Sequence, residues 1–228
     1  MKFYFLRCLI FSILINFLSS NSGTCQETKN YFSISFAPQY LLIEAIRIDL
    51  EKEINGGKNR IVVAPYFYYG TTDKYADQPN LNNSLINSTN TYQDDEVSGL
   101  GLESLYKFIM VPHENASPYL AAGLGYHHIR LKYLGTNWEP VERDGLEYLE
   151  LTEANQEEII NRLDIIGLIG YRQSFQNGFL FDFFMGPVLK NSNIKNTHNF
   201  ARVQDNPLYH YGYNGITLRI GFSLGVKF

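Results

Sequence analysis

Ionisable residues alternate with apolar residues along several segments of this chain. Arg47, Asp49 and Glu51 are separated by Ile48 and Leu50. Carboxylates beside basic groups can form ion pairs, transfer protons or bind metal ions. A spacing of two places all three on one side of an extended strand and the apolar side chains on the other. The pattern therefore predicts ion pairing on one face of a β-sheet.

Two adjacent histidines, His127 and His128, are candidates for acid–base chemistry. Neighbouring residues of a strand point to opposite faces, and no Ser follows at a spacing of two. The sequence thus offers no base–nucleophile pair, and a surface or interfacial position is expected for both histidines. No catalytic residue, cofactor or metal ligand is predicted.

Acidic residues concentrate in the segment 139–158, which contains Glu139, Glu142, Asp144, Glu147, Glu150, Glu153, Glu157 and Glu158. Carboxylate oxygens can bind Ca²⁺ or Mg²⁺, but the spacing of a dedicated Ca²⁺ loop is missing. A solvated acidic loop is expected here, with divalent ions able to bridge it to lipopolysaccharide. Asn80–Thr91, rich in Asn, Ser and Thr, is expected to be a second loop.

The elements that position these residues are strands, and the clearest is Ile216–Phe228. Seven apolar residues alternate there without a fault with Thr217, Arg219, Gly221, Ser223, Gly225 and Lys227. Period two over this length predicts a strand with one apolar and one polar face. The segment also exceeds the roughly 9–11 residues that a tilted strand needs to cross a bilayer.

Turn residues and alternation predict eight strands in all. They are Asn30–Pro38, Leu41–Glu53, Asn59–Gly70, Glu96–Met110, Ala116–Tyr133, Glu158–Phe175, Phe179–Lys190 and Ile216–Phe228. Short turns (Asn55–Lys58, Val111–Asn115, Asn177-Gly178) alternate with long connections (Thr71–Asp95, Leu134–Gln156, Asn191–His210), and only Gln39-Tyr40 separates the first two strands. Three structureless connections of this length are uncommon in a compact soluble domain. Short turns at one end and long loops at the other are typical of outer-membrane barrels, which have an even number of strands.

The register of these strands follows from the energy of exposing charge to lipid. An Arg or Lys that faces lipid near the midplane costs about 2–4 kcal/mol, so the charged faces are expected inside the barrel. The expected interior network is Arg47, Asp49, Glu51, Glu103, Lys107, Arg162, Asp164, Arg172, Asp182 and Arg219. Glycines on the inward face, among them Gly123 and Gly125, leave room for these side chains. Asn59–Gly70 does not settle its own register, because both of its faces are apolar or aromatic.

An eight-stranded barrel is only wide enough for its side chains to fill. Because an unpaired buried charge is very unfavourable, the five acids and five bases of the network are expected to pair and plug the interior. The alternative is a gate or a narrow ion path that opens when the pairs exchange partners.

The N-terminus has the layout of a secretory signal peptide. Lys2 and Arg7 precede an apolar run, Cys8–Leu18, that is too short for a transmembrane helix. Cleavage after Cys25 would leave residues 26–228 as a single barrel domain without cysteine, which excludes disulfides and thiol chemistry. Acylation of Cys25, as in a lipoprotein, is the alternative. Cleavage would move the net charge from −4 to −6, with 17 Lys and Arg against 23 Asp and Glu, which argues against a nucleic-acid partner.

On these residues the chain resembles the small outer-membrane barrels, such as the membrane domain of outer-membrane protein A and its eight-stranded relatives. A signal peptide followed by Gln26 is similar to exports of the Bacteroidetes group. The resemblance implies that Phe222, Leu224, Val226 and the terminal Phe228 form the signal read by the barrel insertion machinery. It implies a location in the bacterial outer membrane, among its lipids and lipopolysaccharide. The sequence departs from the larger relatives in one respect: no peptidoglycan-binding domain is expected after Phe228, so a cell-wall tether is not implied.

The resemblance specifies architecture and location but not activity. The first expectation is a non-enzymatic protein with a structural, adhesive or surface-binding role and an unidentified extracellular partner. A pore or transport-related barrel is the alternative, followed by a lipid-A-modifying barrel enzyme. A soluble periplasmic barrel is the remaining possibility.

Overall fold

A computed structural model describes residues 31–72, 95–111, 116–196, 206–207 and 210–228, with only the backbone described at 134–139 and 151–154. The predicted signal peptide, residues 1–25, and the predicted loop Asn80–Thr91 lie outside the described residues.

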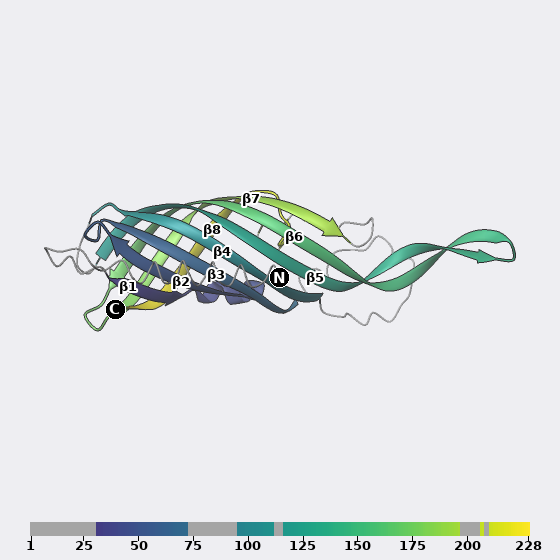
Figure 1. Cartoon of the computed structure of the whole chain (residues 1–228), viewed down its shortest axis with the longest axis horizontal. Helices are drawn as coiled ribbons and strands as arrows, with labels where there is room; N and C mark the ends of the chain where they lie inside the picture. Colours follow the sequence, from purple (N-terminus) through teal and green to yellow (C-terminus); the bar gives the residue numbers. More distant parts are fainter. Residues whose placement is uncertain (1–30, 73–94, 112–115, 197–205, 208–209) are drawn as a thin grey trace, which may run out of the picture.

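The described chain is all-β and forms one closed barrel of eight antiparallel strands in sequence order (Figure 1). The strands are β1 (Phe32–Phe36), β2 (Ala45–Ile54), β3 (Asn59–Thr72), β4 (Asp95–Ile109), β5 (Ala116–Arg143), β6 (Leu146–Ser174), β7 (Phe179–Asn196) and β8 (Gly215–Lys227). The predicted number of strands and their antiparallel order are confirmed.

Pairing between the first and last strands closes the sheet. Ser33 lies opposite Lys227 and Phe36 opposite Leu224. The amide of Phe228 donates a hydrogen bond of 2.8 Å to the carbonyl oxygen of Phe32. Because β1 and β8 pair with each other, neither forms an open sheet edge along this stretch.

The tight turns at one end of the barrel use residues suited to left-handed backbone. Asn55 and Gly56, between β2 and β3, have φ angles of 53° and 64°. Gly178, between β6 and β7, has a φ of 83°, a conformation that glycine adopts without a steric penalty. These are the positions at which the sequence predicts short turns.

The connection between β1 and β2 differs from the prediction. Instead of the two-residue link Gln39-Tyr40, a short 3₁₀ helix, η1 (Pro38–Ile43), lies between them, and β2 begins at Ala45 and not at Leu41. The hydroxyl of Tyr40, a buried residue of η1, accepts a 2.8 Å hydrogen bond from Arg47 Nη1. The segment therefore folds against the barrel interior, which no strand-period argument could reveal.

The predicted loop Leu134–Gln156 is also wrong. β5 and β6 continue as a paired ribbon from Tyr133↔Gln156 to Arg143↔Leu146, and this twisted ribbon projects from the barrel (Figure 1). Asp144 and Gly145, with φ angles of 56° and 76°, form its two-residue turn. Asp-Gly with positive φ at both positions is the preferred sequence of a type I′ hairpin.

Side chains alternate between a polar interior and an apolar exterior. On the outside, Leu102, Leu124, Ile165 and Ile220 each expose 50–57% of their surface. The register of β3, open in the sequence, is set with Val62, Ala64, Tyr66 and Tyr68 buried. Among the described residues, no helix is long and apolar enough to cross a membrane.

Candidate functional site

The ten residues expected in the interior all point into the barrel, where nine are buried and Arg219 is partly buried. Strand alternation turns them inward from five strands, β2, β4, β6, β7 and β8. Strands β3 and β5 add further polar groups. Their ion pairs fall into two networks.

The first network is centred on Glu103 of β4. Its carboxylate accepts two hydrogen bonds from the Arg219 guanidinium, of 2.8 and 2.9 Å. Arg47 lies 3.5 Å from Glu103 and donates a 2.6 Å hydrogen bond to Asp49. Paired parallel hydrogen bonds between guanidinium and carboxylate fix both groups in orientation.

Asp164 of β6 extends this network across the barrel. It lies 2.9 Å from Arg162 Nε and 3.6 Å from Arg219 Nη2. Arg47, Arg219 and Arg162 thus face Asp49, Glu103 and Asp164, so the formal charges of this network balance when histidine is neutral.

The second network is centred on Glu51 and Asp182 and lies nearer the short turns. Arg172 donates hydrogen bonds to both oxygens of Glu51 and, at 2.9 Å, to Asp182. Lys107 Nζ bridges the same two carboxylates at 3.0 and 2.7 Å. The hydroxyl of Tyr119 donates a 2.5 Å hydrogen bond to Asp182.

Apolar side chains separate the two networks. Leu105 occupies the inward position between Glu103 and Lys107 on β4, and Leu168 lies between Asp164 and Arg172 on β6. Both belong, with Phe184, to one buried cluster whose members expose 6% of their surface or less. An ion moving along the axis would therefore have to displace packed hydrocarbon as well as ion pairs.

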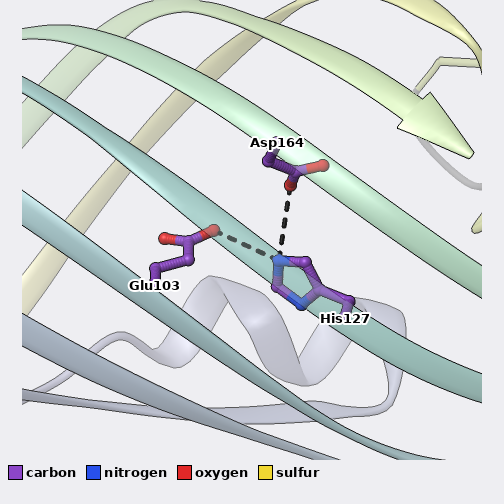
Figure 2. A group of neighbouring side chains, drawn as sticks. All are labelled: Glu103, His127 and Asp164. Carbon is purple, nitrogen blue, oxygen red and sulfur yellow. Dashed lines mark ion pairs between the residues drawn. The ribbon is translucent and has the colours of Figure 1, made fainter.

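His127 contradicts the expectation of a surface or interfacial position. It is fully buried, and its Nε2 lies 3.5 Å from Glu103 and 3.4 Å from Asp164. Figure 2 shows the imidazole on β5 facing both carboxylates. On the other side of the ring, Nδ1 lies 2.9 Å from the hydroxyl of Tyr68.

The inward orientation of His127 could have been predicted from the sequence. Gly123 and Gly125 are expected to face inward, so the period of two places His127 inward as well. A side chain at Gly101 would overlap the imidazole, and a Cβ at Gly125 would lie 3.2 Å from its Nε2. Two glycines thus form the space that the ring fills. His128, by contrast, is exposed as expected, and its ring contacts Asn161 at 2.8 Å.

Glu103, His127 and Asp164 could also hold a metal ion, since one ligand atom of each lies within 4.8 Å of the others. The competing cations are already present, because Arg219 and Arg162 contact the same two carboxylates. A divalent ion would have to enter beside these guanidinium groups. The arrangement therefore suits an internal ion-pair network with a histidine in it better than a metal centre.

The same geometry works against catalysis at this histidine. Tyr68, His127, Glu103 and Asp164 could pass a proton between them, but Tyr68 exposes 3% of its surface and the other three none. A substrate would have no contact with them unless the barrel opened.

Besides His127, four residues that contact the networks were absent from the predicted set of ten. Arg60 lies 3.2 Å from Glu53 and 3.6 Å from Glu51, and Lys227 lies 3.7 Å from Glu53. Glu53 and Lys227 follow the inward period of Glu51 and Arg219, so alternation alone could have found them. Arg60 could not be found, because its strand has apolar or aromatic residues on both faces; Tyr119 carries no charge pattern.

Three of the four residues proposed as an assembly signal lie on the outer face of β8, and the fourth, Phe228, directly follows this strand. Phe222, Leu224, Val226 and Phe228 expose 37%, 37%, 45% and 69% of their surface. They form a continuous apolar strip beside the closing strand pair.

Comparison with known proteins gave no relative. No family model, no curated protein and no solved structure matches this chain.

Proposed function

We propose that this chain is an integral outer-membrane protein whose eight strands cross the bilayer around a closed interior. Its role is structural, adhesive or surface-binding, without catalysis and without conduction. The observation that carries the proposal is the inverted distribution of polarity in a closed barrel, with ion pairs inside and large apolar side chains outside.

The apolar outer surface of the barrel favours contact with lipid over contact with water. Large exposed apolar residues occur on all eight strands, among them Ile34, Ile46, Phe67 and Leu100 on the first half of the sheet. Soluble monomers rarely expose contiguous apolar surface of more than a few hundred Å². A bilayer-spanning barrel needs such a band.

The paired and packed side chains of the interior support a barrel whose lumen does not conduct. Each of the ten charged residues has an oppositely charged partner, and a buried apolar cluster lies between the two networks. In planar bilayers we expect no steady conductance from the purified protein. Stable, voltage-independent channel steps would instead favour the pore or transport alternative.

One fractionation experiment tests the proposal most directly. Cells that express the full chain are extracted with sarkosyl, and the insoluble envelope fraction is run on gels with and without heating. A barrel in the outer membrane stays in the insoluble fraction and changes its mobility on heating. Recovery in the soluble periplasmic fraction would overturn the proposal and favour the soluble barrel.

The same envelope preparation also tests how the barrel reaches the outer membrane and what surrounds it there. The proposal expects outer-membrane lipid and lipopolysaccharide around the barrel, and insertion machinery that reads Phe222 to Phe228. Deletion of Phe228 should lower the amount of heat-modifiable protein in the envelope, whereas a soluble barrel would not need this residue for localisation.

A further inference from the structure

The ribbon formed by β5 and β6 leaves the barrel, and in the part of the chain that the structure describes no further strand pairs with either of its outer edges. β5 pairs with β4 only as far as Lys132, and β6 pairs with β7 only as far as Glu158. Beyond these points the described residues of the ribbon pair only with each other. We call residues 140–150 the ribbon tip. Unpaired strand edges offer backbone donors and acceptors to another strand.

The two edges of the ribbon tip are not equivalent. β5 contains Pro140, which has no N–H, and Pro within a sheet is confined to positions where its nitrogen faces away from the partner strand. The outer edge of β5 is therefore interrupted. The edge of β6 from Leu146 to Glu150 has a complete set of backbone groups.

One face of the ribbon tip is acidic. Glu142 lies directly opposite Glu147, and Pro140 opposite Leu149, so these four side chains share a face. Like charges directly opposite each other destabilise a strand pair. The one basic residue of the tip, Arg143, lies opposite Leu146 on the other face and donates a 2.8 Å hydrogen bond to Glu150. Among the described tip residues, nothing of opposite charge shares the face of Glu142 and Glu147.

One exposed apolar residue shares the face of these acids: Leu149 exposes 67% of its surface. Leu146 and Tyr148, which expose 59% and 50%, lie on the other face. All three belong to a part of the chain that projects away from the barrel (Figure 1). The whole segment 139–158 has eight acids and a single base. A second copy of the ribbon would repel the first, so the charge favours a basic occupant.

We propose that the ribbon tip binds a basic, extended segment of another protein, which adds as a strand to the free edge of β6. Strand addition supplies main-chain hydrogen bonds, and alternate side chains supply specificity. Basic side chains of the partner lie beside Glu147, with Glu142 one strand further away on the same face, and their aliphatic parts contact Leu149. The inference rests on the proposed function, which places this end of the barrel on the cell surface.

The test uses the full chain refolded in detergent micelles and a fluorescein-labelled octapeptide of alternating lysine and threonine. Fluorescence anisotropy measures its affinity at low and at physiological salt. We expect saturable binding that the double variant Glu142→Lys, Glu147→Lys weakens by at least about tenfold. The matched control Glu96→Lys changes an exposed acid of β4 outside the ribbon and leaves the affinity within about twofold.

A second probe separates strand addition from simple charge attraction. The same octapeptide with every second amide N-methylated keeps its charge but loses the donors that a strand needs. We expect it to bind at least about tenfold more weakly. Equal affinity of the two peptides, or an equal effect of Glu96→Lys and the double variant, would overturn the proposal.

The folded state of each variant is checked by heat-modifiable gel mobility. A variant in which Asn-Gly replaces Thr136–Glu153 removes the tip and should abolish binding; retained binding would place the site elsewhere. A tip that binds only Ca²⁺ and not the peptide would also overturn the inference. Binding in micelles does not depend on the cellular location, so its failure would leave the membrane proposal standing.

Discussion

Inside this barrel, one buried carboxylate can form ion pairs with several basic side chains. Glu51 faces Arg172, Lys107 and Arg60 at once, and its side chain exposes 2% of its surface. The attraction within such a group offsets a large desolvation penalty, and removing one partner leaves the others uncompensated. The effect of one neutral substitution should therefore exceed that of any surface pair.

Glu51→Gln tests this at nearly constant volume. Because three cations lose their shared anion, we expect the free energy of unfolding to fall by about 3–5 kcal/mol. Urea unfolding in detergent micelles, followed by circular dichroism, measures the change. The control Glu157→Gln breaks an exposed pair with Arg130 (3.0 Å, side chains 34% and 47% exposed), which should cost at most about 1 kcal/mol. Equal effects of the two variants would contradict the buried network.

The space around His127 gives a second test at this scale. A Cβ at Gly101 would overlap the imidazole, whereas a Cβ at Gly167 meets nothing within 4 Å. Gly101→Ala should displace the ring from Tyr68 and lower the free energy of unfolding by about 1–3 kcal/mol.

Gly167→Ala is the matched control and should be neutral, or stabilising by up to about 1 kcal/mol. The same urea titration measures both variants. If the double variant Gly101→Ala, His127→Ala does not recover part of the lost stability, the loss has another origin.

Residue patterns predicted the interior charges well and the histidine badly, for one physical reason. Arg162 and Asp164 alternate with Leu163 and Ile165. A charged side chain that faces lipid is costly, so only the register with both charges inward is favourable. His127 is followed by His128, and a pair of identical residues carries no alternation. Its orientation could come only from the glycines before it.

At the scale of elements, the ribbon of β5 and β6 extends beyond the strand pairing of the barrel. Beyond Lys132 and Glu158, its described residues pair only with each other. The barrel should therefore fold without it. The alternation signal is weak in Leu134–Gln156, where acids and apolar residues mix, but Asp144-Gly145 marks the turn and could have revealed the hairpin.

Gly135 of β5 and Ala154 of β6 are paired in the ribbon. Replacing Thr136–Glu153 by Asn-Gly connects these two residues through a two-residue turn. The new two-residue turn suits a type I′ hairpin. We expect the shortened protein to refold with unchanged heat-modifiable mobility and with a urea midpoint close to that of the full chain. A protein that no longer refolds would mean that the ribbon helps to form the barrel.

The helix η1 shows the limit of strand-based reasoning at this scale. Tyr40 contacts Arg47 through its hydroxyl and packs edge-on against Tyr66 at 5.2 Å between ring centroids. These contacts are tertiary: they depend on β2 and β3 already lying side by side. Pro38 at the first turn of η1 is the one local signal, because proline is tolerated there and fixes φ.

At the scale of the whole molecule, the barrel has the polarity expected for lipid outside and ion pairs inside. The two networks and the apolar cluster between them form successive layers in the interior. The same side chains therefore stabilise the fold and block the lumen. A change that weakens one network should loosen the barrel without opening a path, because the Leu105, Leu168 and Phe184 cluster still separates it from the other.

A single substitution can show whether lipid or water contacts the outer surface of the barrel. Ile220 lies on the outer face of β8 opposite Met185, with 54% of its surface exposed. In a bilayer, Ile220→Arg places a charge in hydrocarbon and should lower the free energy of unfolding by about 2–4 kcal/mol. In water, an exposed substitution of this kind stays within about 0.5 kcal/mol.

The measurement is urea unfolding of the protein refolded in phospholipid vesicles. Leu149→Arg is the control, since Leu149 is 67% exposed on the ribbon tip, outside the apolar surface of the barrel, and should remain within about 0.5 kcal/mol. A large loss at Ile220 with none at Leu149 means that lipid contacts the barrel wall. Two equally small effects would mean that water contacts both residues, and the membrane proposal would then be wrong.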